Sequence, residues 1–257
     1  MKIVVCGAAG RMGQTIVNLA KGDSNFEIIA ALEREGSKAI GTGNPAISSA
    51  KDLDKFLQEA DGIIDFTNPE STLNNLGHAK KYNVPIIIGT TGFSEQQKQE
   101  IDEFSKSVAI VFSPNMSIGV NLLFKLVEES ARKISDYDVE ILELHHNKKK
   151  DAPSGTAAKL AEVVASVKCK KGEDIAVYGR HGTNSLRTKD EVGVFSIRAG
   201  DIVGDHTVYF VGPGERIELT HRASSRDTFA AGALRAAKWI INQKPGLYDM
   251  ADVLNLK

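Results

Sequence analysis

Short apolar runs alternate with longer amphipathic segments along the first half of the chain. The runs are rich in β-branched residues and predict buried strands at Lys2–Cys6, Glu27–Leu32, Gly62–Phe66, Pro85–Gly89 and Ala109–Phe112. Helical spacing of apolar positions predicts helices at Arg11–Lys21, Lys51–Glu59, Pro69–Tyr82, Glu95–Ser105 and Gly119–Lys133. Strands that alternate with helices are typical of a parallel sheet covered by helices. The pattern therefore predicts a Rossmann-like, doubly wound α/β domain.

The pattern changes after about Asp136, where strands follow one another with only one clear helix, Ser154–Ser166, between them. The predicted strands are Asp138–Leu144, Glu191–Arg198, Asp205–Val211 and Glu215–His221. Glycine-containing turns separate the last three, which predicts an antiparallel meander. A final helix is predicted at Asp227–Ile241 and can return to the first domain. The second half therefore predicts a separate α+β domain.

The composition of the chain is that of a folded globular protein. Of its 257 residues, 42% are hydrophobic and 25% are charged, and the formal net charge is −1. Because the chain lacks a basic excess, we expect neither nucleic acid nor an anionic membrane as a partner. Cys6 and Cys169 have no metal-binding or disulfide-framework spacing, and no apolar stretch reaches the length of a membrane span. We therefore expect a soluble, cytoplasmic protein.

A glycine-rich turn, Gly7-Ala8-Ala9-Gly10-Arg11-Met12-Gly13, joins the first predicted strand to the first helix. Gly7 permits a tight turn, Gly10 lets a pyrophosphate approach the backbone, and Gly13 allows the helix to pack closely on the strand. The free amides of the helix start then favour a phosphate. Since Ala9 replaces the middle glycine of the usual motif, a plain strand-to-helix connection stays an alternative.

A second signal for a dinucleotide lies at the end of the next predicted strand. Glu33 follows Gly13 by 20 residues, at the position where an acidic side chain binds the adenosine ribose. Arg34 follows directly, and arginine is the residue that accommodates a 2′-phosphate. A solvated charge pair would have the same sequence, but the spacing favours a cofactor, which is either NADH or NADPH.

Two loops at the carboxyl ends of later strands are further candidates for cofactor binding. They are Gly89-Thr90-Thr91-Gly92 and Ser113-Pro114-Asn115-Met116-Ser117. Ligands of open α/β sheets bind at this edge, and small hydroxyl and amide side chains there can bond a nicotinamide carboxamide. Ordinary turns use the same residue types, so it is the position at the sheet edge that favours function.

The segment from Glu143 to Ala157 combines two histidines, three lysines and a helix start. His145 and His146 end a predicted strand, and Ser154 is a good N-cap whose helix offers free amides near Gly155 and Thr156. Cations beside a helix start suit a carboxylate, and histidine and lysine can transfer protons. A solvated lysine run is the alternative. Adjacent strand residues face opposite sides, so we expect no metal site here.

Motifs from both halves resemble the 4-hydroxy-tetrahydrodipicolinate reductases, or dihydrodipicolinate reductases, along essentially the whole chain. Besides the glycine turn, the resemblance rests on 31–36, on 65–67, on 89–93, on 115–121, on His145-His146 followed by Asp151-Ala152-Pro153-Ser154-Gly155-Thr156-Ala157, and on 198–204. It implies a reductase of the diaminopimelate route to lysine. In the reaction that the resemblance implies, hydride would pass from NADH or NADPH to a small cyclic dicarboxylate, and water would be lost from the 4-hydroxy precursor.

The resemblance also implies residue roles. His145 and Lys149 would transfer protons, and His146, Gly155 and Thr156 would bind substrate. The cofactor would contact Gly7, Ala8, Ala9, Gly10, Arg11, Met12, Glu33, Arg34, Gly89, Thr90, Thr91, Ser113, Pro114, Asn115 and Met116. The family fold implies a dinucleotide-binding domain of residues 1–117 and 227–257. It further implies a substrate-binding domain of residues 118–226, whose mixed, open sheet forms a homotetramer.

Two other functions compete with this interpretation. One is another two-domain reductase, such as an aspartate or homoserine dehydrogenase, which lacks the pairing of His-His with Ser-Gly-Thr. The other is a cofactor-sensing binding protein, which would not need a proton donor.

Overall fold

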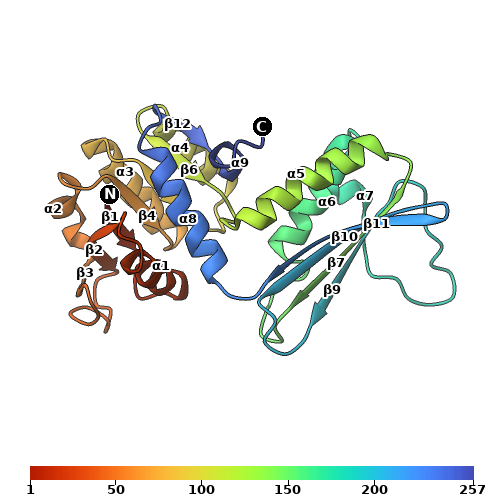
Figure 1. The fold of residues 1–257 in the computed structure, drawn as a ribbon, viewed down its shortest axis with the longest axis horizontal. Helices are drawn as coiled ribbons and strands as arrows, with labels where there is room; N and C mark the ends of the chain where they lie inside the picture. Colours follow the sequence, from red (N-terminus) through yellow and green to blue (C-terminus); the bar gives the residue numbers. More distant parts are fainter. The chain divides into compact units, whose positions relative to one another are not determined.

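The structure is a computed structural model that describes residues 1–257, and the chain divides into two compact units. Unit 1 comprises Met1–Ile118 and Arg226–Lys257, and unit 2 comprises Gly119–Ser225. Each unit has its own β-sheet (Figure 1). None of the helices has the length and apolar character needed to cross a membrane.

Unit 1 contains a seven-stranded parallel sheet in the order β12-β6-β5-β4-β1-β2-β3. Its strands are β1 (Lys2–Cys6), β2 (Glu27–Glu33), β3 (Ile47–Ser49), β4 (Gly62–Asp65), β5 (Ile86–Ile88), β6 (Ala109–Phe112) and β12 (Gly246–Tyr248). The strand order reverses between β1 and β4, which is the position where doubly wound sheets bind ligands. This confirms the predicted fold class.

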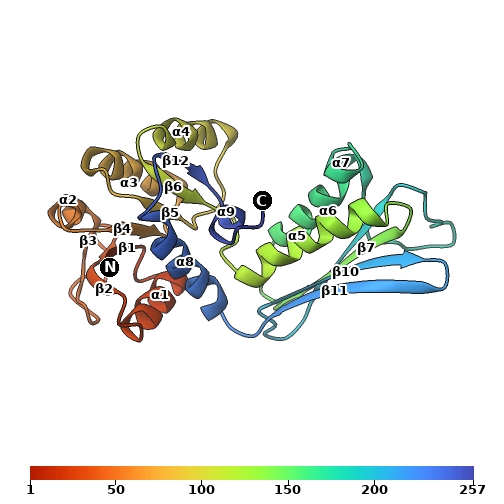
Figure 2. The same ribbon diagram turned by 45° about the horizontal axis from the view of Figure 1, so that its top comes forward.

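Helices cover both faces of this sheet, so its strands are buried on both sides (Figure 2). Ile3 and Val5 of β1 pack in one apolar cluster, whereas Val4 and Cys6 pack in the other. The first cluster includes residues of α1 (Arg11–Lys21), α8 (Asp227–Ile240) and α9 (Met250–Val253). The second includes residues of α2 (Leu53–Leu57), α3 (Pro69–Tyr82) and α4 (Glu95–Ser105), and the short helix η1 (Ala50–Asp52) precedes α2.

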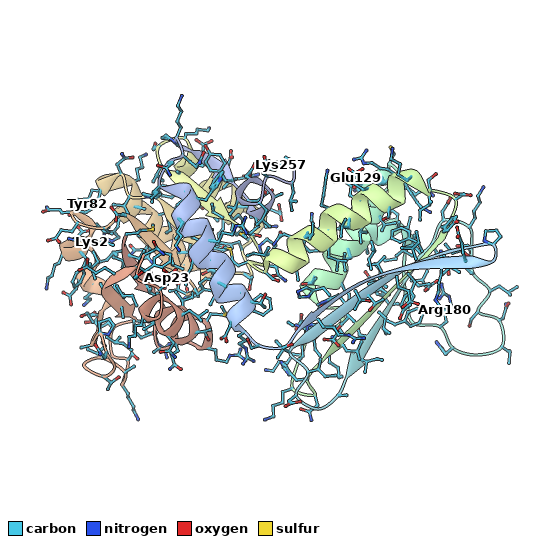
Figure 3. All side chains as sticks on the ribbon, in the orientation of Figure 1. Lys2, Asp23, Tyr82, Glu129, Arg180 and Lys257 are labelled. Atoms are coloured by element: carbon cyan, nitrogen blue, oxygen red, sulfur yellow. The ribbon has the colours of Figure 1, made fainter.

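The final helix returns to unit 1. Ala230, Ala233 and Ala237 of α8 are fully buried in the first cluster. Asp23 follows α1 and is labelled in Figure 3, and its carboxylate lies 2.8 Å from Nζ of Lys238 on α8. The chain thus leaves unit 1 after β6 and comes back to complete it.

Unit 2 contains a mixed five-stranded sheet in the order β11-β10-β7-β9-β8. Its strands are β7 (Asp138–His145), β8 (Ala176–Tyr178), β9 (Val192–Arg198), β10 (Gly204–Gly212) and β11 (Glu215–Ala223). Leu123 and Val127 of α5 (Ile118–Lys133) and Leu160 and Val164 of α6 (Gly155–Val167) pack in its apolar core. The short helix α7 (Gly172–Ile175) follows α6. Alternate residues of β7, beginning with Val139, are buried in this core.

The prediction of an antiparallel meander is wrong for β9. β10 and β11 form the expected hairpin, but β9 pairs in parallel with β7, which separates it from β10. The turn after β9 continues this pairing, since Ala199 N donates to the carbonyl of His145 and Asn147 N donates to that of Gly200. Turn residues mark where a strand ends, but they do not determine which neighbour the strand pairs with.

Candidate active site

The glycine turn of unit 1 has the geometry expected of a phosphate-binding turn. Gly7 has a φ of 78°, and a Cβ there would lie 2.3 Å from the carbonyl oxygen of Phe66. A Cβ on Gly13 would lie 2.1 Å from the carbonyl oxygen of Gly7, so only glycine lets α1 pack this closely. Gly10 is the N-cap of α1 and supplies no side-chain cap. The first turn of α1 is thus a favourable position for an anion.

A cavity of 690 Å³ opens beside this turn. It is lined by Cys6, Gly7, Gly10, Leu32, Glu33, Arg34, Glu35, Ala50, Phe66, Thr67, Asn68, Glu70, Ser71, Asn74 and Asn75. Four predicted cofactor residues, Gly7, Gly10, Glu33 and Arg34, are among these. The lining from Phe66 to Asn75 was not predicted. This part of the lining follows from the strand order of the structure, because β4 is the neighbour of β1 at the point where the order reverses.

Glu33 joins the end of β2 to the glycine turn. Its carboxylate accepts hydrogen bonds from Ala9 N and Arg34 N, both at 3.1 Å. The side chain of Arg34 is exposed, and the neighbouring Glu35 forms a 2.6 Å ion pair with Lys51. Glu33 is therefore held at the rim of the cavity with its oxygens beside the turn, while Arg34 is available to a ligand.

The remaining predicted cofactor residues lie at the same edge of the sheet. Ala8, Ala9, Arg11 and Met12 belong to the turn and the start of α1, while Gly89, Thr90 and Thr91 follow β5, and Ser113, Pro114, Asn115 and Met116 follow β6. Met116 is buried in the apolar core, so its main chain is the part suited to a ligand. Gly89 packs against Phe66, since a Cβ would lie 2.2 Å from that ring.

Asp65, the last residue of β4, holds two loops at this edge of the sheet in place, namely the loops that follow β4 and β5. It is fully buried, and its Oδ1 accepts hydrogen bonds from Thr67 N at 3.0 Å and from the hydroxyls of Thr67, Thr72 and Thr90 at 2.7 to 3.2 Å. Its Oδ2 accepts one from Asn75 at 2.8 Å. Burial raises the pKa of Asp65, and these hydrogen bonds oppose that shift. The carboxyl group thus fixes the loops after β4 and β5.

The second group of predicted residues gathers in unit 2, where β7 ends and α6 begins. His145 is the last residue of β7 and is largely buried, while His146 next to it is half-buried. Ser154 is the N-cap of α6, and its hydroxyl accepts a hydrogen bond from Ala157 N at 3.2 Å. A Cβ built on Gly155 would meet nothing within 4 Å, so the space beside the helix start is open. Thr156 lies in the same first turn.

Lys149 differs from its two lysine neighbours. Its side chain is only 20% exposed and its Nζ lies 2.8 Å from the carboxylate of Asp151, whereas Lys148 and Lys150 are exposed. The pairing with Lys149 lowers the pKa of Asp151. The lysine run therefore contains one half-buried member between two solvated ones.

A buried carboxylate that we did not predict as part of the site connects His145 to the helix start. Oε2 of Glu143 lies 2.5 Å from Nδ1 of His145, and Oε1 accepts a hydrogen bond from Ser154 N at 3.0 Å. Arg198 donates to both oxygens at 2.7 and 2.8 Å. Burial opposes ionisation of Glu143, but the hydrogen bonds from His145, Arg198, Ser196 and Ser154 outweigh it and hold its pKa well below the usual value.

His206 also belongs to this group, although we did not predict it as a site residue. Its Nε2 lies 3.0 Å from the hydroxyl of Ser154, and its ring packs edge-on against His145 at 5.2 Å between centroids. Burial, with a smaller effect from His145, lowers the pKa of His206 to about 3.

The sequence did contain a signal for Glu143 as a site residue. Glu143 lies two residues before His145 in β7, so both side chains are on the same, buried face of the strand.

A dinucleotide-type cavity in one unit and a histidine beside a helix start in the other define a class, the two-domain nicotinamide-dependent oxidoreductases. More narrowly, the chain belongs to the dihydrodipicolinate reductase family. The family model for the N-terminus of dihydrodipicolinate reductase matches residues 1–116, and the model for the C-terminus matches residues 119–254. The recognised resemblance is thereby confirmed, and the chain is a reductase.

Full-length relatives agree with this assignment. The chain is 47% identical to the 4-hydroxy-tetrahydrodipicolinate reductase of Syntrophotalea carbinolica and 48% identical to that of Trichlorobacter lovleyi, with 100% of each chain covered. A solved structure of dipicolinate-bound dihydrodipicolinate reductase from Paenisporosarcina sp. TG-14 has the same fold, with a TM-score of 0.79, 24% identity and 98% of each chain covered.

Proposed function

We propose that this chain reduces 4-hydroxy-tetrahydrodipicolinate to tetrahydrodipicolinate with loss of water, in the diaminopimelate route to lysine. The observation that carries the proposal is the full-length identity of 47 and 48% to reductases of that name. The second support is chemical. The dianionic product and precursor need an anion site next to a proton-transfer group. In unit 2, contacts through Glu143, Arg198 and Asp151 connect His145, Lys149 and the start of α6.

We assign the cofactor to unit 1 and the substrate to unit 2. The turn from Gly7 to Met12 and the rim residues Glu33 and Arg34 bind the adenosine and pyrophosphate part. The loops after β5 and β6, with Gly89, Thr90, Thr91 and 113–116, bind the nicotinamide part, which supplies the hydride. In unit 2, His146, Gly155 and Thr156 hold a substrate carboxylate. Free cysteines at positions 6 and 169 suit the cytoplasm.

His145 and Lys149 perform the proton transfer in this proposal. Hydride addition leaves an electron pair on the substrate, and a proton delivered in the same pocket quenches it. Lys149 is half-buried and His145 is held by Glu143, so both are better placed for this step than the exposed Lys148 and Lys150.

The experiment couples the enzyme to the preceding synthase, supplied with pyruvate and aspartate semialdehyde, and follows the absorbance of NADH and NADPH. His145→Gln and Lys149→Ala are each expected to lower kcat by about 10²- to 10⁴-fold, the usual contribution of a positioned acid. Lys148→Ala and Lys150→Ala serve as matched controls and should change kcat little. Equal losses for all three lysine variants would instead indicate a general electrostatic effect.

Both NADH and NADPH are proposed as cofactors, because Arg34 is exposed at the rim next to Glu33. Arg34→Ala should weaken NADPH binding by about 1.5 to 3 kcal/mol, the value of a charge-assisted hydrogen bond, and should change NADH binding little. Fluorescence titration of both cofactors against the variant measures this. Equal losses for the two would contradict the assignment of Arg34 to the 2′-phosphate.

A homotetramer formed through the sheet of unit 2 is also part of the proposal. Leu142 pairs with Phe195 on the face of the sheet opposite the helices, and Ile197 on the same face is 42% exposed. An apolar sheet face of this kind suits association with further copies. Light scattering should give four times the mass of one chain.

A further inference from the structure

Glu143 is a buried carboxylate of unit 2 that takes no direct part in the proposed reaction. Its side chain is completely inaccessible to solvent. Glu143 projects from β7 into the same face as Val139 and Ile141, which pack in the apolar core. A carboxylate at such a position is costly unless every lone pair is satisfied. An apolar residue would serve stability alone at least as well, so this carboxylate calls for a further explanation.

The hydrogen bonds of Glu143 determine which nitrogen of His145 carries a hydrogen. Because the pKa of Glu143 lies well below its usual value, the carboxylate is ionised and can only accept hydrogen bonds. Nδ1 of His145, 2.5 Å from Oε2, must therefore donate. In the neutral ring this leaves Nε2 without a hydrogen, as the nitrogen that can take up a proton and deliver it.

The backbone next to Nε2 is shaped to leave that nitrogen accessible. Gly204, the first residue of β10, lies opposite His145, and a Cβ there would come within 3.0 Å of Nε2. The His145 side chain retains 11% of its surface exposed. His206 on β10 packs against the ring, and Arg198 on β9 shares the Glu143 carboxylate with it. Arg198 also donates to the carbonyl of Asp151, whose carboxylate pairs with Lys149 on the loop after β7.

The same carboxylate reaches the start of α6. Oε1 accepts from Ser154 N, and Arg198 bridges both oxygens and also donates to the carbonyl of Asp151 at 2.7 Å. One side chain thus connects three segments: the end of β7, the end of β9, and the loop that leads into α6. Any movement of Glu143 would displace the proton-transfer ring and the anion site together.

We propose that Glu143 is a positioning residue, which holds His145 with Nδ1–H toward itself and Nε2 toward the substrate, and fixes this ring relative to the start of α6. The inference rests on the proposed role of His145. The proton leaves from Nε2, and Glu143 keeps the Nδ1 hydrogen bond throughout without itself being protonated.

A measurement on the unmodified protein tests the orientation of the proton. In protein labelled with ¹⁵N at its histidines, the His145→Gln spectrum identifies the His145 signals. In the neutral ring, Nδ1 should appear protonated and Nε2 unprotonated. A ring protonated at Nε2, or a mixture of the two tautomers, would overturn the proposal.

Kinetics test the catalytic consequence. In Glu143→Gln the amide has one acceptor and one donor, so it cannot serve both His145 and Ser154. We expect kcat to fall by about 10- to 100-fold, part of the contribution of a positioned acid, with the KM for NADH unchanged. Glu191→Gln is the matched control. Glu191 is also buried and paired with an arginine, Arg180. It directly precedes the first residue of β9, whereas Arg198 is the last, so its substitution should leave kcat unchanged.

A double-variant cycle separates positioning from general support of the fold. If Glu143 acts through His145, the double variant Glu143→Gln, His145→Gln should have a kcat within about twofold of His145→Gln alone. Losses that multiply, or a near-normal kcat for Glu143→Gln, would overturn the proposal. A near-normal kcat for His145→Gln would refute the proposed role of His145 itself, and that result is distinguishable because Glu143 is unchanged there.

Discussion

Buried polar residues of unit 2 give it a specific sensitivity to acid. His206 is 4% exposed and touches Ser154 and the ring of His145. Burial is the main reason why its pKa falls to about 3, with the nearby His145 adding to the effect. His206 is thus neutral at physiological pH.

The unfolded chain binds a proton at His206 near pH 6.5, whereas the folded chain does so only near pH 3. The unfolded state therefore binds more protons over this window, and stability should fall as the pH drops below about 6.5. The loss from His206 alone should reach about 2 kcal/mol at pH 5. Thermal unfolding between pH 8 and pH 4.5 measures it.

His206→Gln is the variant that isolates this effect, because the glutamine amide can still reach Ser154 but does not titrate. Its melting temperature should fall less than that of the wild type between pH 6.5 and pH 4.5. Below about pH 4.5 both should lose stability, since the lowered pKa of Glu143 means that its contribution is lost on protonation. Parallel curves above pH 4.5 would contradict the assignment to His206.

At the scale of elements, helix α8 has a contact that only glycine permits. A Cβ on Gly232 would lie 1.8 Å from the carbonyl oxygen of Met116, in the loop that precedes α5. Since the main chain of Met116 belongs to the proposed nicotinamide site, the position of α8 helps to determine the shape of that loop. The close approach explains a residue that otherwise weakens a helix.

Gly232→Ala should therefore destabilise unit 1 by about 1 to 3 kcal/mol through overpacking, despite the better helix propensity of alanine. It should also weaken NADH binding. Gly77→Ala in α3 is the control, because a Cβ there meets nothing within 4 Å. That substitution should stabilise by about 0.5 to 1 kcal/mol. Denaturant unfolding of both variants measures the contrast, and stabilisation by both would show that α8 can shift without cost.

At the scale of the whole molecule, unit 1 is built from both ends of the chain. α8 covers one face of its sheet, and β12 pairs with β6 at the sheet edge. Trp239 of α8 also packs edge-on against Tyr248 of β12 at 5.1 Å. Within the first 118 residues, α1 is therefore the main helical cover for Ile3, Val5 and Ile64 on that face, and the part that α8 and α9 supply is missing.

A chain ending at Ser225 should lose the cooperative unfolding of unit 1 and the binding of NADH. The reason is that the apolar face covered by α8 and α9 would be open to water. Removal of Lys257 alone, whose side chain forms surface ion pairs with Asp249 and Asp252, should change neither property. Circular dichroism and NADH fluorescence measure the two properties. A shortened chain that still binds NADH would show that residues 226–257 are not needed for binding.

Local pattern by itself determined the elements of unit 1 and most of its chemistry. β1, α1, α3 and α4 have the predicted bounds, because each combines an apolar period with clear end signals. The predicted helix at 51–59 is instead η1 followed by α2, and the short edge strands β3, β8 and β12 were not predicted. These three-residue edge strands lack the continuous apolar run that marks β5, so their pattern is too weak to be recognised without their neighbours.

Tertiary structure alone decided which distant residues meet. The sequence places His145 and Ser154 in one segment, but Arg198 and His206 reach them only because β9 and β10 flank β7, and turn residues do not encode that pairing. The same holds for Phe66 and Asn75 in the cavity beside the glycine turn. Periodicity records which side of an element is buried, whereas the partner on that side depends on the packing of the whole chain.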